Sequence, residues 1–342
     1  MNLKDTYHNL FRIAQRGKVL ERYLFMDKYY LVSADGTGFF SSHSVHCDSC
    51  CQKKHLNGTT TYYHQMLTAA IVHPDEPTVL PFAPEAIVKE DGSKKNDCER
   101  NASKRLIPAI RQAHPHLQMI IVEDGLASNG PHIDLLKKNN MHFILGAKPG
   151  DHAWLFDWVN NSDEVKTLEY KEDKKSYKLR YINNVPLNDR RSDLLVNFFE
   201  CTETLQNGKQ RTFSWITDLE VSDTNIKTLM KGARARWKIE NETFNTLKNQ
   251  GYHFEHNFGH GKKMLSTVMA HIMLLAFLID QLQQTACKSF KEALKKVRSN
   301  RKFFWFKFKS IGLTIRVDSW DMFFDIMSGK IIMSAFPVQD SS

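Results

Sequence analysis

The order of apolar and polar residues along the chain predicts an α/β protein. Short apolar runs, which are typical of buried strands, alternate with longer ranges in which apolar residues recur at helical spacing. The expected strands are residues 29–34, 61–72, 78–82, 118–123 and 142–146, and the expected helices are residues 1–28, 97–113 and 131–139. This alternation favours a sheet flanked by helices.

The apolar spacing changes to period two between residues 166 and 219. Period two is typical of antiparallel strands, and Asn207-Gly208 favours a tight turn between two of them. Lysine and arginine are frequent at the outward positions of these strands. We therefore expect a β-rich insertion in the alternating pattern.

A further helix is expected from Gly232 to a stop at Gly251. With a rotation of about 100° per residue, one stripe of this helix holds Trp237, Glu240, Phe244, Leu247 and Lys248. A carboxylate on such an apolar stripe is costly unless it has a partner. Two interpretations of Glu240 remain open: an ion pair with Arg236 one turn earlier, or a metal ligand in an active site.

The rest of the chain divides into clear segments. Residues 264–282 are apolar nearly all round, but polar residues interrupt them, so we expect a core helix and no association with a membrane. The five expected segments are an N-terminal helical segment (1–28), the first part of an α/β core (29–165), the β-rich insertion (166–219), the helix with Glu240 and the core helix (220–285), and a basic, aromatic C-terminal segment of helix, loop and packed aromatic residues (286–342). The basic face of the last segment either contacts phosphate or is solvated.

The net charge and the cysteine content indicate the kind of partner and the cellular compartment. A formal net charge of +9 favours a polyanionic partner. Six cysteines are too few for a disulfide scaffold in 342 residues, and the polar run after Met1 is unlike a signal peptide. We therefore expect a cytoplasmic protein.

A polar loop at residues 43–60 is rich in histidine and cysteine. Cys47 and Cys50 have the spacing of a zinc knuckle. A structural zinc ion needs four ligands, and the candidates to complete the set are His43, His46, Cys51, His55 and His64. The alternative is a loop of unpaired thiols.

Two of the expected strands end on an aspartate followed by glycine, at Asp35 and Asp124. Open α/β sheets build their sites at the carboxyl ends of strands, although an Asx turn is the alternative for Asp35. Together with Glu240, these residues would form a cluster of three carboxylates. Such a cluster attracts two divalent cations, which serve phosphodiester chemistry.

Three motifs carry these carboxylates: Leu31-Val-Ser-Ala-Asp-Gly-Thr37, Ile120-Ile-Val-Glu-Asp-Gly125 and Arg236-Trp-Lys-Ile-Glu-Asn-Glu-Thr-Phe-Asn-Thr-Leu-Lys248. Together they resemble the Asp-Asp-Glu transposases of bacterial insertion sequences, in the branch with a Tyr, Arg, Glu and Lys signature along the last catalytic helix. The resemblance implies a ribonuclease H-like α/β fold, in which helices flank a mixed sheet and the β-rich insertion precedes that helix.

The resemblance also implies roles for these residues. Asp35, Asp124 and Glu240 would be the catalytic ligands of Mg²⁺ or Mn²⁺. Arg236 and Lys248 would contact DNA phosphates near the cut ends.

The implied activity is metal-dependent DNA cleavage at the ends of an insertion sequence, followed by strand transfer into target DNA. The implied partners are both DNA sites and a second copy of the chain, and the protein would associate with the nucleoid. Trp237 either stacks on a displaced base or packs in the core beside Phe244.

Some features depart from the family pattern. Ala233 occupies the position of the signature's tyrosine, and Lys248 comes one residue later than usual. Only 34 residues precede Asp35, so a shortened product that lacks recognition of the element's ends is an open alternative. The others are a metal-dependent nuclease that cuts without joining, a catalytically silent DNA-binding relic or regulator, and a zinc-dependent binding module centred on Cys47 and Cys50.

Overall fold

A computed structural model describes residues 3–89, 96–261, 263–297 and 301–332 of the chain. The strands are β1 (Leu24–Phe25), β2 (Tyr29–Ser42), β3 (Cys51–Lys54), β4 (Thr60–Val72), β5 (Leu80–Pro81), β6 (Glu85–Ile87), β7 (Met119–Glu123), β8 (His142–Gly146), β9 (Lys166–Glu172), β10 (Lys175–Pro186), β11 (Leu195–Thr204) and β12 (Gln210–Thr217). The α-helices are α1 (Leu3–Arg16), α2 (Glu99–Ala113), α3 (Gly130–Lys138), α4 (Ala153–Asn161), α5 (Ile226–Arg234), α6 (Asn245–Asn249), α7 (Leu265–Ala286), α8 (Lys288–Lys296), α9 (Arg301–Thr314) and α10 (Trp320–Ser328). Two 3₁₀-helices, η1 (Val19–Tyr23) and η2 (Asp189–Arg191), and one π-helix, η3 (Ile239–Phe244), complete the described elements.

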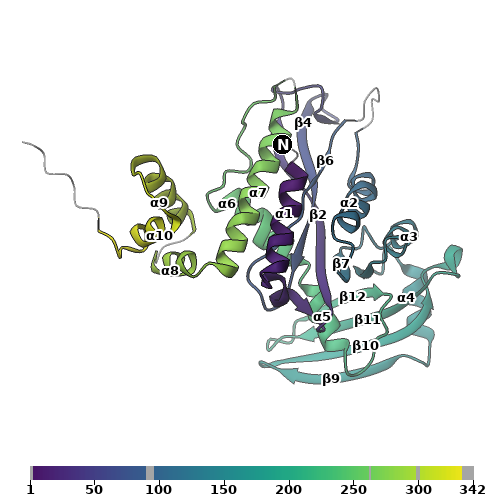
Figure 1. The fold of residues 1–342 in the computed structure, drawn as a ribbon. Helices are drawn as coiled ribbons and strands as arrows, with labels where there is room; N and C mark the ends of the chain where they lie inside the picture. The colour runs from purple at the N-terminus through teal and green to yellow at the C-terminus, as the bar shows by residue number, and fades with distance from the viewer. Residues whose placement is uncertain (1–2, 90–95, 262, 298–300, 333–342) are drawn as a thin grey trace, which may run out of the picture.

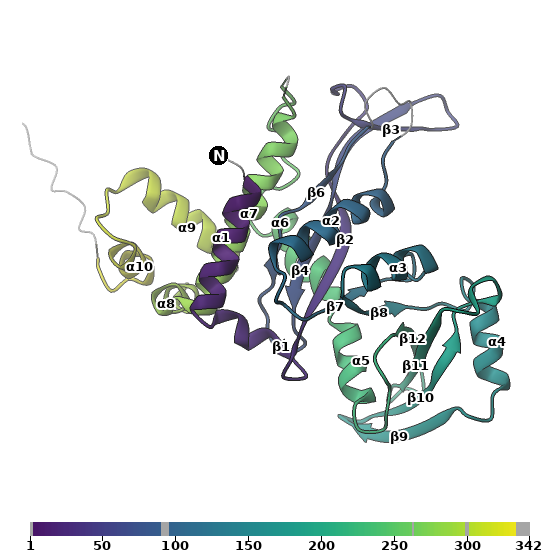
Figure 2. The ribbon, with the colours of Figure 1, turned by 45° about the vertical axis from the view of Figure 1, so that its right-hand side comes forward.

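The strands form one mixed sheet, which confirms the expected α/β class (Figures 1 and 2). Their order is β3-β4-β2-β7-β8-β12-β11-β10-β9, with β1 beside β2 and with β5 and β6 beside β4. β2, β7 and β8 pair in parallel, and β4 is antiparallel to β2. Helices α1 and α7 lie on one side of β2 and β4, and α2 and α3 lie on the other (Figure 1).

The β-rich range at residues 166–219 continues this sheet. Strand β12 pairs with β8, from Trp215 opposite Gly146 to Thr217 opposite Ile144, and β11, β10 and β9 follow outward from it. The antiparallel strands expected from the period-two pattern are present as β9–β12, with Asn207-Gly208 at the turn between β11 and β12. The chain then returns through α5 to the middle of the sheet.

Strand β2 is longer than the sequence pattern predicts. It continues past Asp35 through Gly36 and Gly38 to Ser42, because β4 pairs with it along nearly its whole length and supplies hydrogen-bonding partners. The pairing of β2 with β4 shifts by one residue between Gly38 and Phe40, directly after the second of the two glycines. The prediction that the strand ends at Asp35 is therefore wrong.

The N-terminal helical range and the polar loop also differ from expectation. α1 ends at Arg16, before Gly17 and the left-handed Lys18 (φ 59°), and η1 and β1 follow instead of one helix to residue 28. Residues 1 and 2 lie outside the described part. Within the loop at residues 43–60, residues 51–54 form the edge strand β3, which pairs with β4.

Helix α7 is only partly buried. Its inner side packs against α1 and β5, and the Tyr7 hydroxyl donates a hydrogen bond to the His271 carbonyl oxygen (2.8 Å). Its outer side exposes an apolar stripe of Leu265, Val268, Ile272 and Ile279. By length and composition alone α7 is apolar enough to cross a membrane, and 44% of its most apolar window is buried in the fold.

The C-terminal range packs around a small core of its own beyond α7. α8, α9 and α10 bury Phe290, Phe304, Phe323 and Phe324 together. The aromatic run after residue 302 is packed, as the sequence predicts, and it forms the helix α9. Phe304, Trp305 and Phe308 face this core, whereas Phe303 and Phe306 are exposed. Residues 333–342 of the predicted segment lie outside the described residues.

Candidate active site and metal cluster

Asp35 and Asp124 lie side by side at one edge of the parallel pair β2 and β7. The last paired residues of these strands are Ser33 and Val122, and each aspartate follows two positions later. Asp124 comes directly after β7, where its Oδ1 accepts a hydrogen bond from the backbone N–H of Leu126 (2.9 Å). Both aspartates line a cavity of about 420 Å³. The two aspartates that the sequence singles out therefore line one cavity, although Asp35 lies within its strand.

Glu240 approaches Asp35 from the π-helix η3. Arg236 lies between the two carboxylates: its Nη1 is 2.8 Å from Glu240 Oε1 and 3.8 Å from Asp35 Oδ2. The Ser33 hydroxyl donates a hydrogen bond to the Arg236 carbonyl oxygen (3.1 Å), which fixes the start of this segment to β2. The ion pair that the sequence allowed is therefore present. Glu240 lies outside the cavity that Asp35 and Asp124 line.

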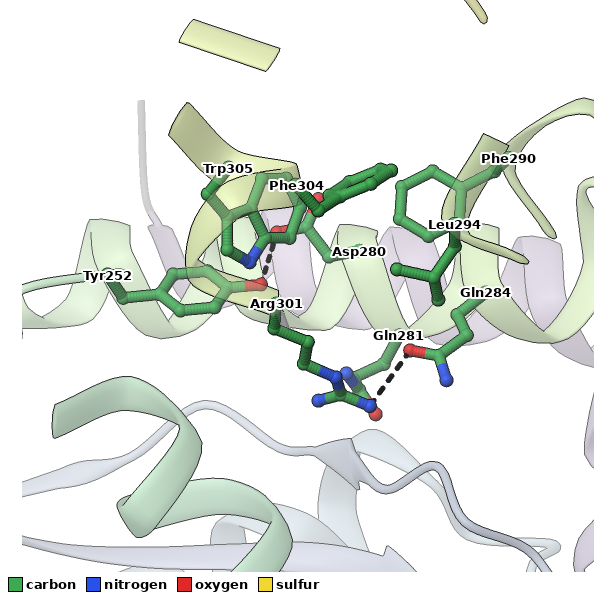
Figure 3. A pocket seen from close by; sticks show the side chains of 9 residues that line it. All are labelled: Tyr252, Asp280, Gln281, Gln284, Phe290, Leu294, Arg301, Phe304 and Trp305. Atoms are coloured by element: carbon green, nitrogen blue, oxygen red, sulfur yellow. Dashed lines mark hydrogen bonds between the residues drawn. The ribbon is translucent and has the colours of Figure 1, made fainter. Parts of the chain in front are cut away.

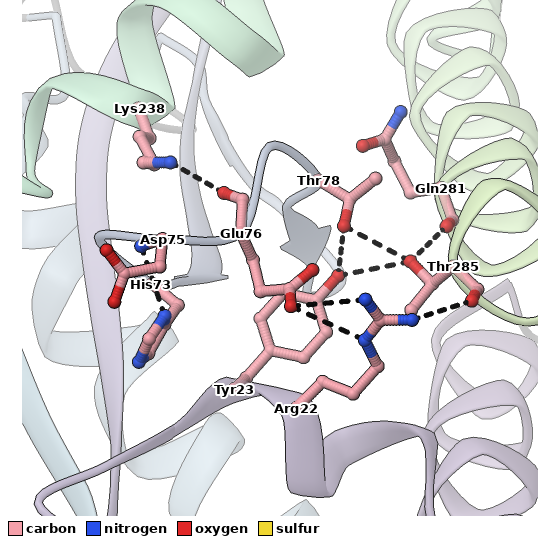
Figure 4. Close-up of polar contacts among 9 residues, drawn as sticks. All are labelled: Arg22, Tyr23, His73, Asp75, Glu76, Thr78, Lys238, Gln281 and Thr285. Atoms are coloured by element: carbon pink, nitrogen blue, oxygen red, sulfur yellow. Dashed lines mark hydrogen bonds and ion pairs between the residues drawn. The ribbon is translucent and has the colours of Figure 1, made fainter.

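A second anchor holds η3 to the turn between β4 and β5. The Lys238 ammonium donates a hydrogen bond to the Glu76 carbonyl oxygen (2.5 Å), and the Glu76 carboxylate pairs with Arg22 (Figure 4). The same turn is tied to α7, because the Thr78 and Thr285 hydroxyls both contact the Tyr23 hydroxyl. The helix that carries Glu240 is thus fixed to β2 on one side and to this turn on the other.

The surroundings of Asp35 disfavour its charge. Burial raises the pKa of Asp35 to about 6; the Gly36 amide and the Arg236 guanidinium oppose this rise, and the charges of Glu240 and Glu99 add to it. Crowding of carboxylates in a partly desolvated place is the situation that a bound cation relieves.

The cavity holds two further acidic residues that the sequence pattern does not single out. Glu99, the first residue of α2, points toward Gly36, and burial together with the charges of Asp124 and Glu123 raises the pKa of Glu99. The sequence pattern places Glu99 in a helix and Glu123 in a strand, and nothing else in it marks either residue as part of a site. The position of α2 above β2 is a tertiary feature, and it alone brings Glu99 to the site.

Glu123 is paired inside the wall of the cavity. Its Oε2 lies 2.5 Å from His132 Nε2 on α3. Burial lowers the pKa of His132, but the charge and hydrogen bond of Glu123 outweigh this effect and raise it. This pair joins α3 to β7, and Asp35, Glu99 and Asp124 are the other acidic residues that line the cavity.

Trp237 is exposed, so of its two expected positions the one in the core beside Phe244 is wrong. Its side chain is 49% exposed, and the Arg236 guanidinium lies 4.6 Å from the centre of its ring. The reason is the local geometry: a turn at residues 235–236 and the π-helix η3 change the rotation per residue, so Ile239 and Leu247 face the core instead. Lys248 forms an ion pair with Glu255 (3.0 Å).

A second cluster of metal-binding side chains lies at the other end of β4. One ligand atom each from Cys47, Cys50, His64 and His260 lies within 4.8 Å of all the others, so the cluster could hold a metal ion. Cys47 and Cys50 belong to the predicted knuckle, and His64 was one of the candidates to complete it. His260 was not, because it is 196 residues from His64 and only the fold brings them together.

The other candidates of the loop are engaged elsewhere. His43 and His55 contact Thr60 and Thr61, His46 stacks on Tyr62, and Cys51 donates a weak hydrogen bond to the Ile87 carbonyl oxygen. At the cluster itself, burial raises the pKa of Cys50 to about 12 and lowers that of His64 to about 4.

Comparison with known proteins adds no family to this picture: no protein-family model matches the chain, and neither does any curated protein.

Proposed function

We propose that the chain is the catalytic domain of an Asp-Asp-Glu DNA transposase. The observation that carries the proposal is the approach of Asp35, Asp124 and Glu240 from three separate elements. Asp35 and Asp124 share one cavity, and Glu240 reaches Asp35 through the guanidinium of Arg236. The three residues are far apart in the sequence, so local structure does not bring them together. A shared catalytic role would account for their approach.

The topology supports a ribonuclease H-like arrangement. Three features of the sheet agree with it: β4 is antiparallel to β2, β2, β7 and β8 are parallel, and helices lie on both sides. The strands β9–β12 enter between β8 and the helix with Glu240, where the family carries its insertion. They extend the sheet, and this gives the insertion a fixed position relative to the carboxylates.

The side chains suit hard divalent cations. Asp35, Asp124 and Glu240 offer carboxylate oxygens, the ligands that Mg²⁺ and Mn²⁺ prefer, and Glu99 adds a fourth carboxylate beside them. In the structure Arg236 supplies the positive charge between Asp35 and Glu240. When bound, such cations activate the attacking hydroxyl and stabilise the leaving oxygen of a phosphodiester.

The chain's own residues would bind and orient the DNA. Arg236 and the exposed face of Trp237 lie next to the carboxylates, where they can meet a backbone phosphate and a displaced base. Lys248, released from Glu255, would neutralise a second phosphate. A second copy of the chain would hold the other end of the element.

The reaction consists of two substitutions at phosphorus. Water attacks the phosphodiester at the element's end, the P–O3′ bond breaks, and the 3′-oxygen leaves as a hydroxyl after it gains a proton. That hydroxyl then attacks a phosphodiester of the target DNA and displaces the target's own 3′-oxygen. No oxidant or reductant is needed, so the site has to supply only positions and charges.

The test is a nicking and strand-joining assay. Supercoiled DNA that carries the flanking ends of the protein's own gene is incubated with Mn²⁺ or EDTA and with wild type, Glu240→Gln or Glu242→Gln. Glu242 is the matched control, because it lies on the same π-helix two residues further along. We expect metal-dependent nicks and joined products with wild type and Glu242→Gln, and their loss by at least about a hundredfold with Glu240→Gln.

Other outcomes identify the alternatives. Nicks without joined products would indicate a metal-dependent nuclease. DNA binding without cleavage, equal for wild type and Glu240→Gln, would indicate a catalytically silent DNA-binding protein and contradict the proposal.

A further inference from the structure

We propose that Cys47, Cys50, His64 and His260 form a structural zinc site that joins the loop before β3 to the segment after α6. The residues come from three separate parts of the fold. Cys47 and Cys50 precede β3, His64 lies within β4, and His260 belongs to the irregular segment between α6 and α7. This inference does not depend on the proposed transposase activity.

The separations of the ligand atoms match a tetrahedral zinc ion. Bonds of about 2.3 Å to sulfur and about 2.0–2.1 Å to nitrogen place the ligand atoms roughly 3.8 Å (S to S), 3.6 Å (S to N) and 3.3 Å (N to N) apart. The two Sγ atoms are 3.7 Å apart, and His64 Nε2 is 3.3 Å from His260 Nδ1. Three of the four sulfur-to-nitrogen separations are 3.5 Å for Cys47 to His64, 3.3 Å for Cys50 to His64 and 3.9 Å for Cys50 to His260, and the fourth, Cys47 to His260, is within 4.8 Å.

Hydrogen bonding alone explains this arrangement poorly. His64 Nε2 lies within 3.5 Å of three atoms at once, namely the two thiol sulfurs and His260 Nδ1. One ring nitrogen either donates one hydrogen bond or accepts one along its single lone pair. A single cation at the centre satisfies all four groups together.

The ligand types select the metal. Two thiolates and two imidazoles are the donor set of closed structural zinc sites, and the cluster includes no carboxylate, which Mg²⁺ would require. The carboxylate site around Asp35 and the Cys/His site therefore suit different metals, and one metal cannot replace the other. All four positions are taken by protein atoms, so the ion would have a structural role.

The site would fix the far end of the segment after α6, whose near end is already held by the buried Phe254 and by the hydrogen bond from Tyr252 to Asp280. The described residues between α6 and α7, 250–261 and 263–264, contain no helix or strand. Phe40 packs edge-on against His260 (ring centres 4.4 Å apart), and Phe39 stacks on His64, so β2 supports both imidazoles. Because α6 continues η3 directly, a fixed end of this segment also limits the movement of the helix that carries Glu240.

The test measures zinc in the protein without DNA or catalysis. Metal content is determined by mass spectrometry after gel filtration for wild type and for two pairs of variants. Cys50→Ser is paired with Cys51→Ser, since Cys51 is the adjacent buried cysteine outside the cluster. His260→Ala is paired with His256→Ala, since His256 lies in the same segment and outside the cluster.

We expect about one zinc ion per chain in wild type and in both control variants, and less than about one fifth of that in Cys50→Ser and His260→Ala. Since these two variants can lose zinc through misfolding, His260→Cys supplies a thiolate at the same position and should retain the ion. Cobalt(II) should replace zinc and give the visible absorption of a tetrahedral thiolate complex in wild type. A zinc-free wild-type protein that does not take up zinc or cobalt, or equal zinc in His260→Ala and His256→Ala, would overturn the proposal.

Discussion

The carboxylate of Glu99 fills the space that any side chain at Gly36 would need. A Cβ atom at Gly36 would lie 2.0 Å from Glu99 Oε1 and 2.5 Å from its Cδ. The absence of a side chain next to Asp35 therefore lets the first residue of α2 reach the cavity. Conformational freedom is not the reason for this glycine, because it lies within a regular strand.

Gly36→Ala should displace Glu99 and leave the fold intact. The obstructing atoms belong to the end of a flexible side chain, so we expect a loss in the free energy of unfolding of only about 1 kcal/mol. If Glu99 acts with the carboxylates of the site, DNA cleavage should fall at least about tenfold. Gly38→Ala is the control, because its nearest neighbour would be the His64 carbonyl oxygen at an ordinary 3.7 Å. Equal cleavage by both variants would show that the position of Glu99 is unimportant.

Trp237→Ala should weaken DNA binding without a loss of stability. Because the side chain is exposed, the free energy of unfolding should change by less than about 0.5 kcal/mol. A base stacked on this ring would contribute about 1–3 kcal/mol, so affinity for a DNA end with unpaired bases should fall about tenfold. Trp158→Ala removes an equally exposed tryptophan (47%) from α4 and should bind as wild type does. Fluorescence anisotropy with a labelled DNA end compares the two, and equal affinities would exclude stacking on Trp237.

The elements of the fold were largely predictable because each has a local cause. The apolar runs at β7 and β8, the period-two range of β9–β12 and the hairpin at Asn207-Gly208 follow from short-range patterns. The extent of β2 was not predictable from Gly36 and Gly38, because its continuation depends on pairing with β4. Trp237 was misplaced for a related reason: the helical wheel assumes a constant rotation per residue, which η3 does not keep.

The residues of the candidate sites also divide into those that local sequence patterns place and those that depend on tertiary packing. Asp35 and Asp124 could be placed together, since both are two positions beyond the last pair of two parallel strands. Glu99 and His260 could not, because each reaches its cluster through packing between elements that are distant in sequence. The sequence named Cys47 and Cys50 by their spacing and included His64 among the candidates, whereas only the tertiary fold adds His260.

Lys238→Met should uncouple the helix that carries Glu240 from the turn between β4 and β5. The ammonium loses its hydrogen bond to the Glu76 carbonyl oxygen, and a bond of this kind is worth about 1.5–3 kcal/mol. Burial already lowers the pKa of Lys238, so part of that free energy is offset by the cost of its desolvation. We expect the free energy of unfolding, measured in urea, to fall by about 1 kcal/mol. We also expect DNA cleavage to fall at temperatures where the variant is fully folded. Lys231→Met, an exposed lysine on α5, should change neither quantity. An unchanged cleavage rate in Lys238→Met would show that this anchor does not position Glu240.

Asp280 makes the stability of the fold depend on pH at the contact between α7 and the C-terminal helices. Its Oδ2 accepts a hydrogen bond from the Tyr252 hydroxyl (2.6 Å) in a pocket that Trp305 and Arg301 also line (Figure 3). Burial raises the pKa of Asp280 to about 7, and the Tyr252 hydrogen bond and the Arg301 charge reduce the rise. The carboxyl group is therefore protonated in the fold over a range in which it is ionised in the unfolded chain.

The direction of the effect follows from this difference. Between about pH 4 and pH 7 the Asp280 carboxyl group binds fewer protons in the unfolded state than in the folded state. The contribution of Asp280 to stability is therefore complete below this pH range and is lost as the pH rises through it. Asp280→Asn cannot ionise and retains an oxygen that accepts the Tyr252 hydrogen bond. At pH 8 it should be more stable than wild type by about 1–3 kcal/mol, and the advantage should shrink toward zero at pH 4.5. Urea unfolding of both proteins across this pH range measures the difference in stability. The contributions of the other titrating groups are the same in both proteins and cancel in this difference. A difference that does not change with pH would mean that Asp280 has an ordinary pKa in the folded protein, and that the contact between α7 and the C-terminal helices is open to water.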